Sequence, residues 1–466
     1  MRVMKFGAAT VSEVARLREV TRLVKQSADE GQKPVIVCAA LPGVTNALIG
    51  AARAAARGNE DEASAARRTL WHRHRTLAEH LIDDPWERET LYHEWAELLR
   101  QYDRITRAVA TLGEHSPRSI DAVAAIGERF VIHLIATALR RQGVAARTID
   151  AGELLITDDH FGHAHVLLEE SFQRIRERLP PTLKSGIVPV ITGYIGATRS
   201  GAPTTLGRGG GDYSATLLGA ALGADVVEIW GDVDGLLTAD PKIVPEARAL
   251  DRLTYHEAAE IAALGGEVLH PQTLTPLAGR GIPLLLRNLL APSAPGTRVT
   301  DAVDGAARPA RAIVSARELS LLRLSARPLA PDQSWSSDLV ARALMLLRTD
   351  GVEILSASQS FSERSLAIAV RAADDAFARN LLAEAFAAEI ASNALHPPSV
   401  TTPVAFVAVV GAGGADLIPT TLMSLGRSGA HTLYLAQGSA SASVVCILPE
   451  AQVELVVRQL HADLEL

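Results

Sequence analysis

The sequence predicts an α/β protein in which a mainly parallel central sheet lies between helices and is followed by two small ferredoxin-like modules. Two observations predict this class. Over residues 1–300, short runs rich in Val and Ile alternate with Ala- and Leu-rich amphipathic segments, an order typical of a buried parallel sheet. Beyond residue 317 the chain contains an internal repeat, and each copy has the order strand, helix, strand, strand, helix.

The composition limits the classes to which the protein can belong. A chain of 466 residues with 48% hydrophobic and 21% charged residues is long enough for roughly two to four domains. The net charge of −7 provides no basic field for nucleic acid. No uninterrupted apolar run approaches the roughly 18 residues that cross a bilayer, and the N-terminus lacks the order of a secretory signal. The 2 cysteines provide neither a disulfide framework nor zinc spacing, so we expect a cytoplasmic protein without a membrane partner.

The first zone, residues 1–300, is expected to be the catalytic domain. Its clearest strands are "KPVIVCAA", "GIVPVITGYI", "DVVEIWGDV" and "IPLLLRNLL". The stretch from about residue 50 to 112 is expected to form long surface helices, and its His72 and His74 point to different helix faces, which argues against a metal site. The Pro- and Gly-rich residues that follow predict a linker at 301–316.

The third zone carries the repeat. "DGVEILSASQSFSERSLAIAV" and "SGAHTLYLAQGSASASVVCIL" align without a gap at a spacing of 78 residues, so that Gln359 corresponds to Gln437. We expect one module at 317–392 and another at 400–466, with nesting of one in the other as an alternative. The modules are either packing units or sensors of a small molecule, because a Gln at the same strand end offers an amide donor and acceptor twice.

Lys5 stands at the end of the first expected strand, in "VMKFGAAT", and Gly7 follows. A lysine here is either an ordinary surface charge or a phosphate ligand beside a glycine turn. Further along, "LGRGGGDYSATLLGAALGAD" has Arg208, three glycines and Asp212 directly before an Ala/Leu helix. Such a turn lets the backbone approach an anion at the helix N-terminus, although a simple cap by Asp212 is the alternative.

The stretch "EIWGDVDGLLTADPKIVPEARAL" ends a strand at Asp232 and continues to Asp240 and Lys242. Acidic side chains at a strand end, beside a glycine turn, can contact the edge of a nucleotide that has Mg²⁺ nearby. A lysine shortly beyond them can contact the phosphates of that nucleotide. The alternative is a hairpin or crossover loop punctuated by Asp and Gly.

Together these motifs resemble those of aspartokinases, members of the amino-acid kinase superfamily. "KFG", "LPGVTNALI", "GERF", "LGRGGGDYSA", "DVDGLLTADPK" and "VLHPQTL" occur in the family's order and at its approximate spacings. The terminal repeats look like the paired ACT domains that follow the kinase domain. "SASQS" and "LAQGS" are most similar to the kinase half of bifunctional aspartokinase–homoserine dehydrogenases. The resemblance covers essentially the whole chain.

The resemblance implies an amino-acid kinase fold and phosphorylation of the L-aspartate side chain by ATP with Mg²⁺, feeding lysine, threonine and methionine synthesis. It implies a homodimer or higher homo-oligomer, and threonine or lysine as an effector at the ACT domains. It also implies roles for individual residues. Those residues are Lys5 and Asp212 as the catalytic pair; Thr45, Glu128 and Arg208 for the substrate; Gly7, Gly209, Asp232, Asp240 and Lys242 for the nucleotide; and Gln359 and Gln437 for the effector.

The chain departs from the family pattern mainly on the nucleotide side. The family's opening motif is usually K-F-G-G-T-S, whereas this chain has Ala8, Ala9 and Thr10 after Gly7. Where the family usually has a serine, a threonine, a tyrosine, an arginine and a lysine, this chain has Gly211, Gly231, Leu237, Lys242 and Glu267 in that order. Three hypotheses therefore stay open: a regulated aspartokinase, a nearly inactive homologue that acts as a regulatory partner, and a kinase for another amino-acid carboxylate.

Two further stretches are given structural interpretations. "VVGAGGADL" at 409–417 imitates a dinucleotide loop, but we expect the start of a helix in the second module. "TDDHFGHAHV" groups His160, His163 and His165, and we interpret it as a loop over the substrate site and not as a metal cluster. No resident metal site is predicted.

Overall fold

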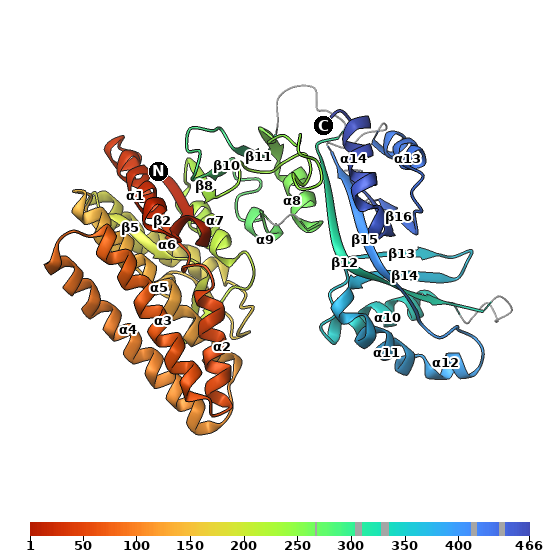
Figure 1. Ribbon diagram of the computed structural model, residues 1–466, viewed down its shortest axis with the longest axis horizontal. Coiled ribbons are helices and arrows are strands. Elements are labelled where there is room, and N and C mark those ends of the chain that lie inside the picture. The colour runs from red at the N-terminus through yellow and green to blue at the C-terminus, as the bar shows by residue number, and fades with distance from the viewer. Residues whose placement is uncertain (266–267, 303–309, 328–334, 412–416, 438–442) are drawn as a thin grey trace. The chain divides into compact units, whose positions relative to one another are not determined.

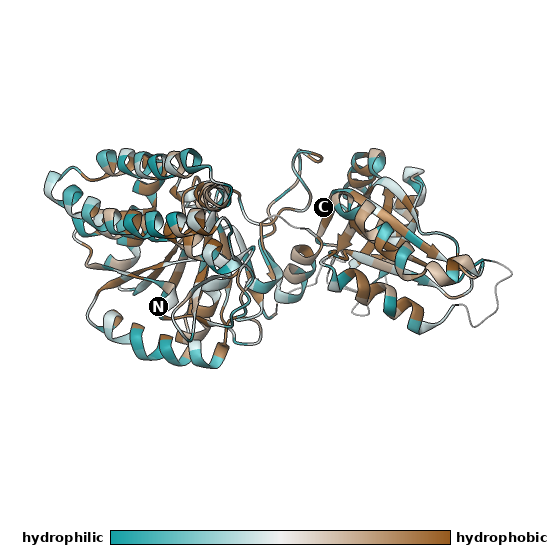
Figure 2. Ribbon diagram, turned by 90° about the horizontal axis from the view of Figure 1, so that it is seen from below, coloured by the Kyte–Doolittle hydropathy of each residue, from teal (hydrophilic) through white to brown (hydrophobic). Residues whose placement is uncertain are grey.

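The computed structural model describes residues 1–265, 268–302, 310–327, 335–411, 417–437 and 443–466. The chain forms two compact units (Figure 1). The first comprises Met1–Leu236, Ala249–Ala258 and Val268–Val303; the second comprises Leu237–Arg248, Ala259–Glu267 and Asp304–Leu466. In both, hydrophobic residues gather on the inner strands, whereas outward helix faces are hydrophilic (Figure 2).

The first unit contains an eight-stranded sheet with the order β3-β5-β2-β1-β8-β10-β11-β9. Its neighbouring strands are parallel except for the antiparallel pair β10 and β11. The strands are β1 (Arg2–Phe6), β2 (Pro34–Cys38), β3 (Ala146–Ile149), β5 (Val188–Thr192), β8 (Val226–Gly231), β9 (Arg252–Thr254), β10 (Leu284–Asn288) and β11 (Thr297–Thr300). The prediction of a mainly parallel sheet is thus confirmed.

Helices surround this sheet, and a small three-stranded sheet adjoins it. The helices are α1 (Val14–Asp29), α2 (Val44–Ala56), α3 (Glu60–Leu81), α4 (Pro85–Leu112), α5 (Pro117–Arg141), α6 (Leu168–Lys184), α7 (Gly210–Leu222) and α9 (Pro271–Leu274). Helix α8 (Tyr255–Ala263) is divided between the units after Ala258. The small sheet has the order β4 (Ile156–Thr157), β6 (Ile195–Thr198) and β7 (Pro203–Thr205). Local signals set the helix ends: Asp84 accepts the N–H of Trp86 at the start of α4, and Gly113 ends it with φ +69°.

Helix α5 lies in the core. It is long and apolar enough to cross a membrane, but 83% of its most apolar window is buried inside the protein, as in a core helix. Glu128 and Arg129 interrupt its apolar run, which is why a search for uninterrupted runs does not find it. Gly127 lets α5 approach α2 closely, since a Cβ there would lie 2.8 Å from Val44.

The second unit contains a six-stranded antiparallel sheet with the order β13-β14-β12-β15-β17-β16. Its strands are β12 (Ala312–Ser325), β13 (Ser356–Ser360), β14 (Ser365–Arg371), β15 (Ser399–Val410), β16 (Tyr434–Gln437) and β17 (Ser443–Pro449). Its helices are α10 (Ser337–Thr349), α11 (Asp375–Ala385), α12 (Ala387–Ala391), α13 (Leu417–Ser428) and α14 (Val453–Asp463). Strands β14 and β17, and helices α11 and α14, begin 78 residues apart, which confirms the predicted repeat.

The two long strands of this sheet serve both repeats. Residues Ala312–Ala316 of β12 pair with the second half of β15. Beyond them, Leu319–Arg323 continue along the first half of β15, and Leu319–Ser325 pair with β14 on the other side. A bulge separates the two halves, and Glu318 within it has φ +60°. We expected residues 301–316 to be a linker, but Ala312–Ala316 form the start of a strand, because β15 provides their hydrogen-bonding partner. Part of the dinucleotide-like stretch at 409–417 lies outside the described residues, and so does Glu267.

Residues Leu237–Arg248 follow β8 in sequence but belong to the second unit. Ile243 and Val244 are buried in its core beside α14 residues such as Leu460. The Thr238 hydroxyl lies 3.0 Å from Nε2 of His461, and the Thr238 carbonyl accepts the N–H of Ile313. The expected first domain, residues 1–300, is thus interrupted by a segment that packs elsewhere.

A buried histidine joins the helices α3, α4 and α5. His74 contacts Trp95 and Phe130, with ring centroids 5.7 Å and 4.8 Å away, and its Nδ1 lies 2.7 Å from the Leu70 carbonyl oxygen. Burial outweighs this hydrogen bond and lowers the pKa of His74 to about 4. His72 on the same helix is exposed, as the two-residue spacing predicts.

We predict that acid destabilises the first unit through His74. The unfolded chain binds a proton on this side chain near its ordinary pKa of 6.5, but the folded protein binds it only near 4. Stability is therefore full above pH 6.5 and is lost as the pH falls towards 4, by about 3 kcal/mol in all. Urea unfolding followed by tryptophan fluorescence between pH 7 and 4 measures this change. His74→Phe should remove that part of the pH dependence and His72→Gln should keep it; equal profiles for all three proteins would contradict the assignment.

Candidate functional site

The predicted catalytic residues meet at the carboxyl edge of the parallel sheet. Lys5 lies near the end of β1, between Val37 of β2 and Ile229 of β8. The turns that follow these strands therefore surround it, as does the N-terminus of α7. Clefts at this edge of an α/β sheet are where ligands usually bind.

Lys5 and Asp212 form an ion pair. The Lys5 Nζ lies 2.5 Å from the Asp212 carboxylate, and their side chains are 11% and 14% exposed. Asp212 stands in the first turn of α7, where backbone N–H groups and the helix dipole favour an anion. The pair thus fixes an ammonium group beside a helix N-terminus, and both features attract negative charge.

Two glycines lie against the lysine side chain. A Cβ on Gly7 would lie 3.3 Å from the Lys5 Nζ, closer than a side chain normally tolerates, so Gly7 suits this turn. The N–H of Gly7 also donates to the Trp230 carbonyl of β8. A Cβ on Gly211 would lie 3.4 Å from Lys5 Cε, an ordinary contact, so the absence of a side chain at 211 is not a steric need.

The residues after Gly7 form a short 3-10 helix, Ala8–Val11. The hydroxyl retained at Thr10 is fully buried and donates to the Gly7 carbonyl at 2.6 Å. Thr10 therefore stabilises the turn from inside, and Ala8 and Ala9 contribute methyl groups where the family pattern has a glycine and a hydroxyl.

Glu128 of α5 is the third predicted residue at this edge. It is only 3% exposed, and its Oε2 has no hydrogen-bond partner among the described residues. Burial raises its pKa to about 8, although the Ala40 N–H and the charge of Lys5 both oppose that shift. A buried carboxyl group with an unused oxygen beside a cation-lined edge is suited to receive a positively charged group of a ligand.

The remaining substrate residues lie in the turns of the same unit. Thr45 is the second residue of α2 and is partly buried. Arg208 is exposed in the turn between β7 and α7, directly before Gly209. Gly209 has φ +71°, and a Cβ there would lie 2.5 Å from the Cβ of His270. The "VLHPQTL" motif thus packs on the glycine turn, a contact that the linear sequence does not reveal.

The predicted nucleotide residues are divided. Asp232 follows β8 in the first unit, is exposed, and lies 3.9 Å from the Arg16 guanidinium. Asp240 and Lys242 are exposed residues of Leu237–Arg248 in the second unit, and the Lys242 N–H donates to Asp240 Oδ1. Both residues thus belong to the second unit, whereas Lys5 and Asp232 belong to the first.

Asp121 is a residue that sequence reasoning missed. It is 1% exposed and accepts three hydrogen bonds, from the N–H and hydroxyl of Thr205 and from the N–H of Gly162. Burial raises its pKa against the effect of these donors. Asp121 stands two helical turns before Glu128, so a spacing of seven on α5 is the signal that could have found it. It joins α5 to β7 and to the loop after β4.

In the second unit, the predicted effector residues lie on the two edge strands. Gln359 belongs to β13 and Gln437 to β16, and these strands contact each other. The Nε2 of Gln359 is buried and has no hydrogen-bond partner in the described part of the chain. An amide donor in that state can bind a polar ligand.

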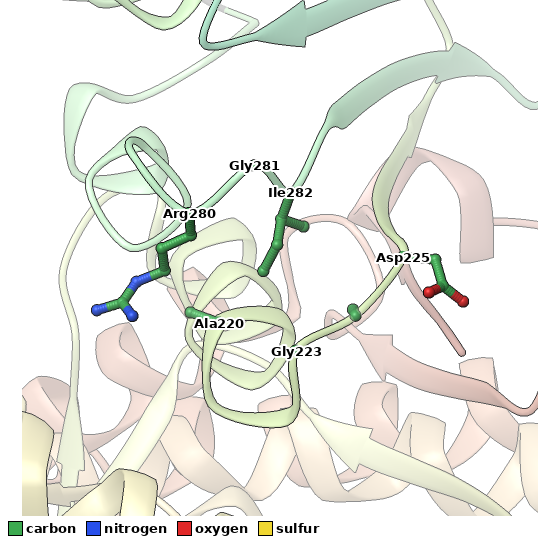
Figure 3. Close-up of a pocket in the computed structure, with 7 residues that line it drawn as sticks. Ala220, Gly223, Asp225, Arg280, Gly281 and Ile282 are labelled. Atoms are coloured by element: carbon green, nitrogen blue, oxygen red, sulfur yellow. The ribbon is translucent and has the colours of Figure 1, made fainter.

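A cavity of about 530 Å³ lies away from these residues. It is lined by Ala220, Gly223, Ala224, Asp225, Arg280, Gly281 and Ile282 (Figure 3). These residues lie in the last turn of α7, in the turn between α7 and β8, or directly before β10, at the amino ends of the strands. The cavity is therefore at the edge of the sheet opposite to Lys5, and no predicted site residue lines it.

Comparisons with known proteins agree with this geometry. Aspartokinase 1, chloroplastic, of Arabidopsis thaliana is 35% identical over 328 residues, which cover 69% of this chain and 56% of that protein. The chain spans little more than half the length of the first curated relatives that it matches.

Two solved structures of E. coli aspartokinase III are similar over the full chain. The structure with aspartate and ADP is 27% identical, with a TM-score of 0.82 and 100% coverage of both chains. The structure with lysine and aspartate is also 27% identical, with a TM-score of 0.78 and coverage of 100% and 99%. The profile described as "Amino acid kinase family" matches residues 1–288, more than half of the chain. The chain belongs to the amino acid kinase family.

Proposed function

We propose that this protein is an aspartate kinase, which transfers the γ-phosphoryl group of ATP to the side-chain carboxylate of L-aspartate to form 4-phospho-L-aspartate. The observation that carries the proposal is the Lys5–Asp212 ion pair at the N-terminus of α7, with the buried carboxyl group of Glu128 at the same edge. The similar E. coli aspartokinase III binds aspartate and ADP, which supports this choice of substrates.

The residues of the candidate site can compensate the repulsion between the two anionic reactants. A carboxylate nucleophile needs no general base, but it must approach an anionic phosphoryl group, so the site must supply positive charge and alignment. Lys5 neutralises the transferred group, and Asp212 holds the ammonium in position. Arg208 binds the α-carboxylate of the substrate through its planar fork, and Glu128 binds the α-ammonium. Thr45 completes the substrate contacts.

ATP would bind together with Mg²⁺, which would neutralise negative charge on the phosphates. Gly7 and Gly209 allow the backbone to approach the phosphates, and Asp232, which follows β8, contributes an exposed acidic side chain toward the metal ion. We further propose that Asp240 and Lys242 contact the nucleotide, on the basis of the family motif alone.

The departures from the family pattern favour testing a second function. Gly211 and the buried Thr10 leave fewer hydroxyl groups beside Lys5 than the family pattern provides. A kinase for another amino-acid carboxylate, or a nearly inactive regulatory homologue, would share the same fold and the same ion pair.

One assay separates these functions. The purified protein is incubated with ATP, Mg²⁺ and L-aspartate, and the acyl phosphate is trapped as its hydroxamate. We expect hydroxamate from aspartate, and at least a hundredfold loss in Lys5→Ala, whose helical content should be unchanged by circular dichroism. Lys25→Ala is the matched control, because Lys25 pairs with Asp29 at 2.8 Å on the surface of α1.

The other outcomes are equally informative. Turnover with a different amino acid, but not with aspartate, would replace aspartate as the substrate. No hydroxamate above background, together with no ATP binding by calorimetry, would exclude a kinase altogether.

We predict that kcat/KM for aspartate rises with pH up to about 8. Only the ionised Glu128 attracts the substrate ammonium, and its pKa in the free protein is about 8. The rate constant should therefore fall by close to tenfold per pH unit below that value. Glu128→Gln should lower kcat/KM and leave it flat between pH 6 and 8.

The same variant provides a readout that does not depend on catalysis. In the wild type the folded state holds a proton on Glu128 up to about pH 8, whereas the unfolded chain releases it near 4.5. The free energy of unfolding of the wild type therefore declines as the pH rises from about 4.5 to 8. Glu128→Gln has no such proton to lose, so it should not show this decline. At pH 8 the variant should be more stable than the wild type by roughly 1–4 kcal/mol. If Glu128→Gln were less stable than the wild type at pH 8, the result would contradict the destabilisation that we assign to burial of the Glu128 carboxylate.

We also propose that an amino acid regulates the enzyme by binding at Gln359 and Gln437. The buried, unused amide of Gln359 supports an effector site, and E. coli aspartokinase III has been solved with lysine. Threonine is our first choice of effector and lysine the second. We further propose a homodimer or higher homo-oligomer, and a cytoplasmic location, with which the free and buried Cys38 and Cys446 are consistent.

Titration of activity with threonine and with lysine tests the effector site. Gln359→Ala and Gln437→Ala should each raise the half-inhibitory concentration by about tenfold, because a hydrogen bond to a charged ligand is lost. Gln173→Ala on α6 is the control, since this exposed glutamine pairs with Glu177 in the first unit. Inhibition that is unchanged in both variants would count against their role.

A further inference from the structure

The loop between β4 and α6 brings three metal-ligating side chains together. The Nδ1 atoms of His160 and His165 lie 3.1 Å and 2.9 Å from the same carboxylate oxygen, Oδ2 of Asp158. One ligand atom from each of the three residues lies within 4.8 Å of the others. The two imidazole rings meet edge to face, with centroids 5.6 Å apart. The tertiary structure therefore selects a different set from the sequence grouping, which included His163 and omitted Asp158.

The carboxylate is held in place by the backbone of the same loop. Oδ1 of Asp158 accepts the N–H of His165 at 2.9 Å and the N–H of His160 at 3.2 Å. The Asp158 N–H donates to the His165 carbonyl, and Thr157 forms a β-bridge with Val166. One oxygen is thus used for the fold of the loop, and the other faces the two imidazoles.

These separations are close to those of a metal site. With bonds of about 2.0–2.1 Å, the ligand atoms of a tetrahedral zinc ion lie roughly 3.3 Å apart. The two distances from the carboxylate oxygen to the imidazole nitrogens, 2.9 and 3.1 Å, need to open by only a few tenths of an ångström once the ion replaces the imidazole protons. The third separation, between ligand atoms of the two histidines, is within 4.8 Å, and rotation of the exposed rings would adjust it. The histidine side chains are each 75% exposed, so an ion can enter and a water can occupy the fourth position.

We propose that Asp158, His160 and His165 form a binding site for one divalent transition-metal ion of the zinc class. Imidazole nitrogen with a single carboxylate favours Zn²⁺, Co²⁺ and Ni²⁺ over Mg²⁺, which prefers oxygen ligands. The site is distinct from the proposed magnesium–nucleotide complex and does not depend on kinase activity.

The site adjoins the predicted substrate residues through the rest of the loop. Gly162 donates to Asp121, and the Ala164 N–H donates to the Thr205 carbonyl of β7. His163 lies over Gly207, where a Cβ would come within 2.4 Å of its ring, and Arg208 follows directly. A bound ion restrains the loop that supports this turn.

Calorimetric titration of the full chain with ZnCl₂ tests the site, and Co²⁺ absorption reports its geometry. We expect one ion per chain and intense visible bands for four-coordinate Co²⁺. His160→Asn and His165→Asn should each weaken the affinity at least tenfold, because asparagine keeps an amide hydrogen-bond donor near the carboxylate but is a poor ligand for these metals. His93→Gln is the matched control: this histidine is 78% exposed and faces a single carboxylate, Glu89.

Three results would overturn the proposal. The first is no saturable Zn²⁺ binding below about 1 mM, which corresponds to a negligible affinity. The second is an unchanged affinity in both loop variants, and the third is an equal loss in His93→Gln. Displacement of Zn²⁺ by Mg²⁺ at equal concentration would also count against it. Circular dichroism of each variant checks that the fold is retained.

Discussion

The ion pair between Lys5 and Asp212 is the contact on which the whole candidate site depends. An ammonium group at a helix N-terminus faces the positive end of the helix dipole, an unfavourable position that the carboxylate of Asp212 compensates. Removal of either partner would leave an almost buried charge without its counter-ion. The pair therefore ties β1 to α7, and Gly7 leaves room for the lysine, since a Cβ there would lie 3.3 Å from Nζ and would require a small shift. The result is an edge of the sheet that attracts anions before any ligand arrives.

Glu128 shows that a site arranged in advance for a ligand lowers the stability of the unliganded protein. A carboxyl group buried on α5 with an unused oxygen does not stabilise the unliganded fold, and its raised pKa reflects that cost. Gly127 makes the arrangement sterically feasible, because it lets α5 lie against α2 and brings Glu128 to the Ala40 N–H. Asp121, two turns earlier, is also buried, but three donors satisfy it. The contrast separates a carboxylate that supports loops from one that is available to a ligand.

The second unit shows how a repeated sequence becomes a single sheet. The long strands β12 and β15 each contribute to both repeats, because β12 pairs with β15 on both sides of the bulge at Glu318 and gains β14 as a second neighbour beyond it. The edge strands that carry Gln359 and Gln437 contact each other, so equivalent positions of the two repeats come close in space. Leu237–Arg248 adds apolar residues to the same core. Asp240 and Lys242, proposed for the nucleotide, thus belong to the same unit as Gln359 and Gln437, proposed for the effector.

By itself the sequence determined the parallel sheet, the repeat at a spacing of 78 residues and the identity of Lys5, Glu128 and Asp212 as candidates, because periodicity, glycine turns and short motifs are local properties. Only the tertiary structure decided which of these candidates meet. It joined Lys5 to Asp212 and Asp121 to Thr205, assembled Asp158 with His160 and His165, and assigned Asp240 and Lys242 to the second unit. It also showed that Ala312–Ala316 form a strand, because the partner for their backbone hydrogen bonds lies about 90 residues away in the sequence, in β15. Contacts of this kind depend on burial and on packing between distant segments, which no local pattern encodes.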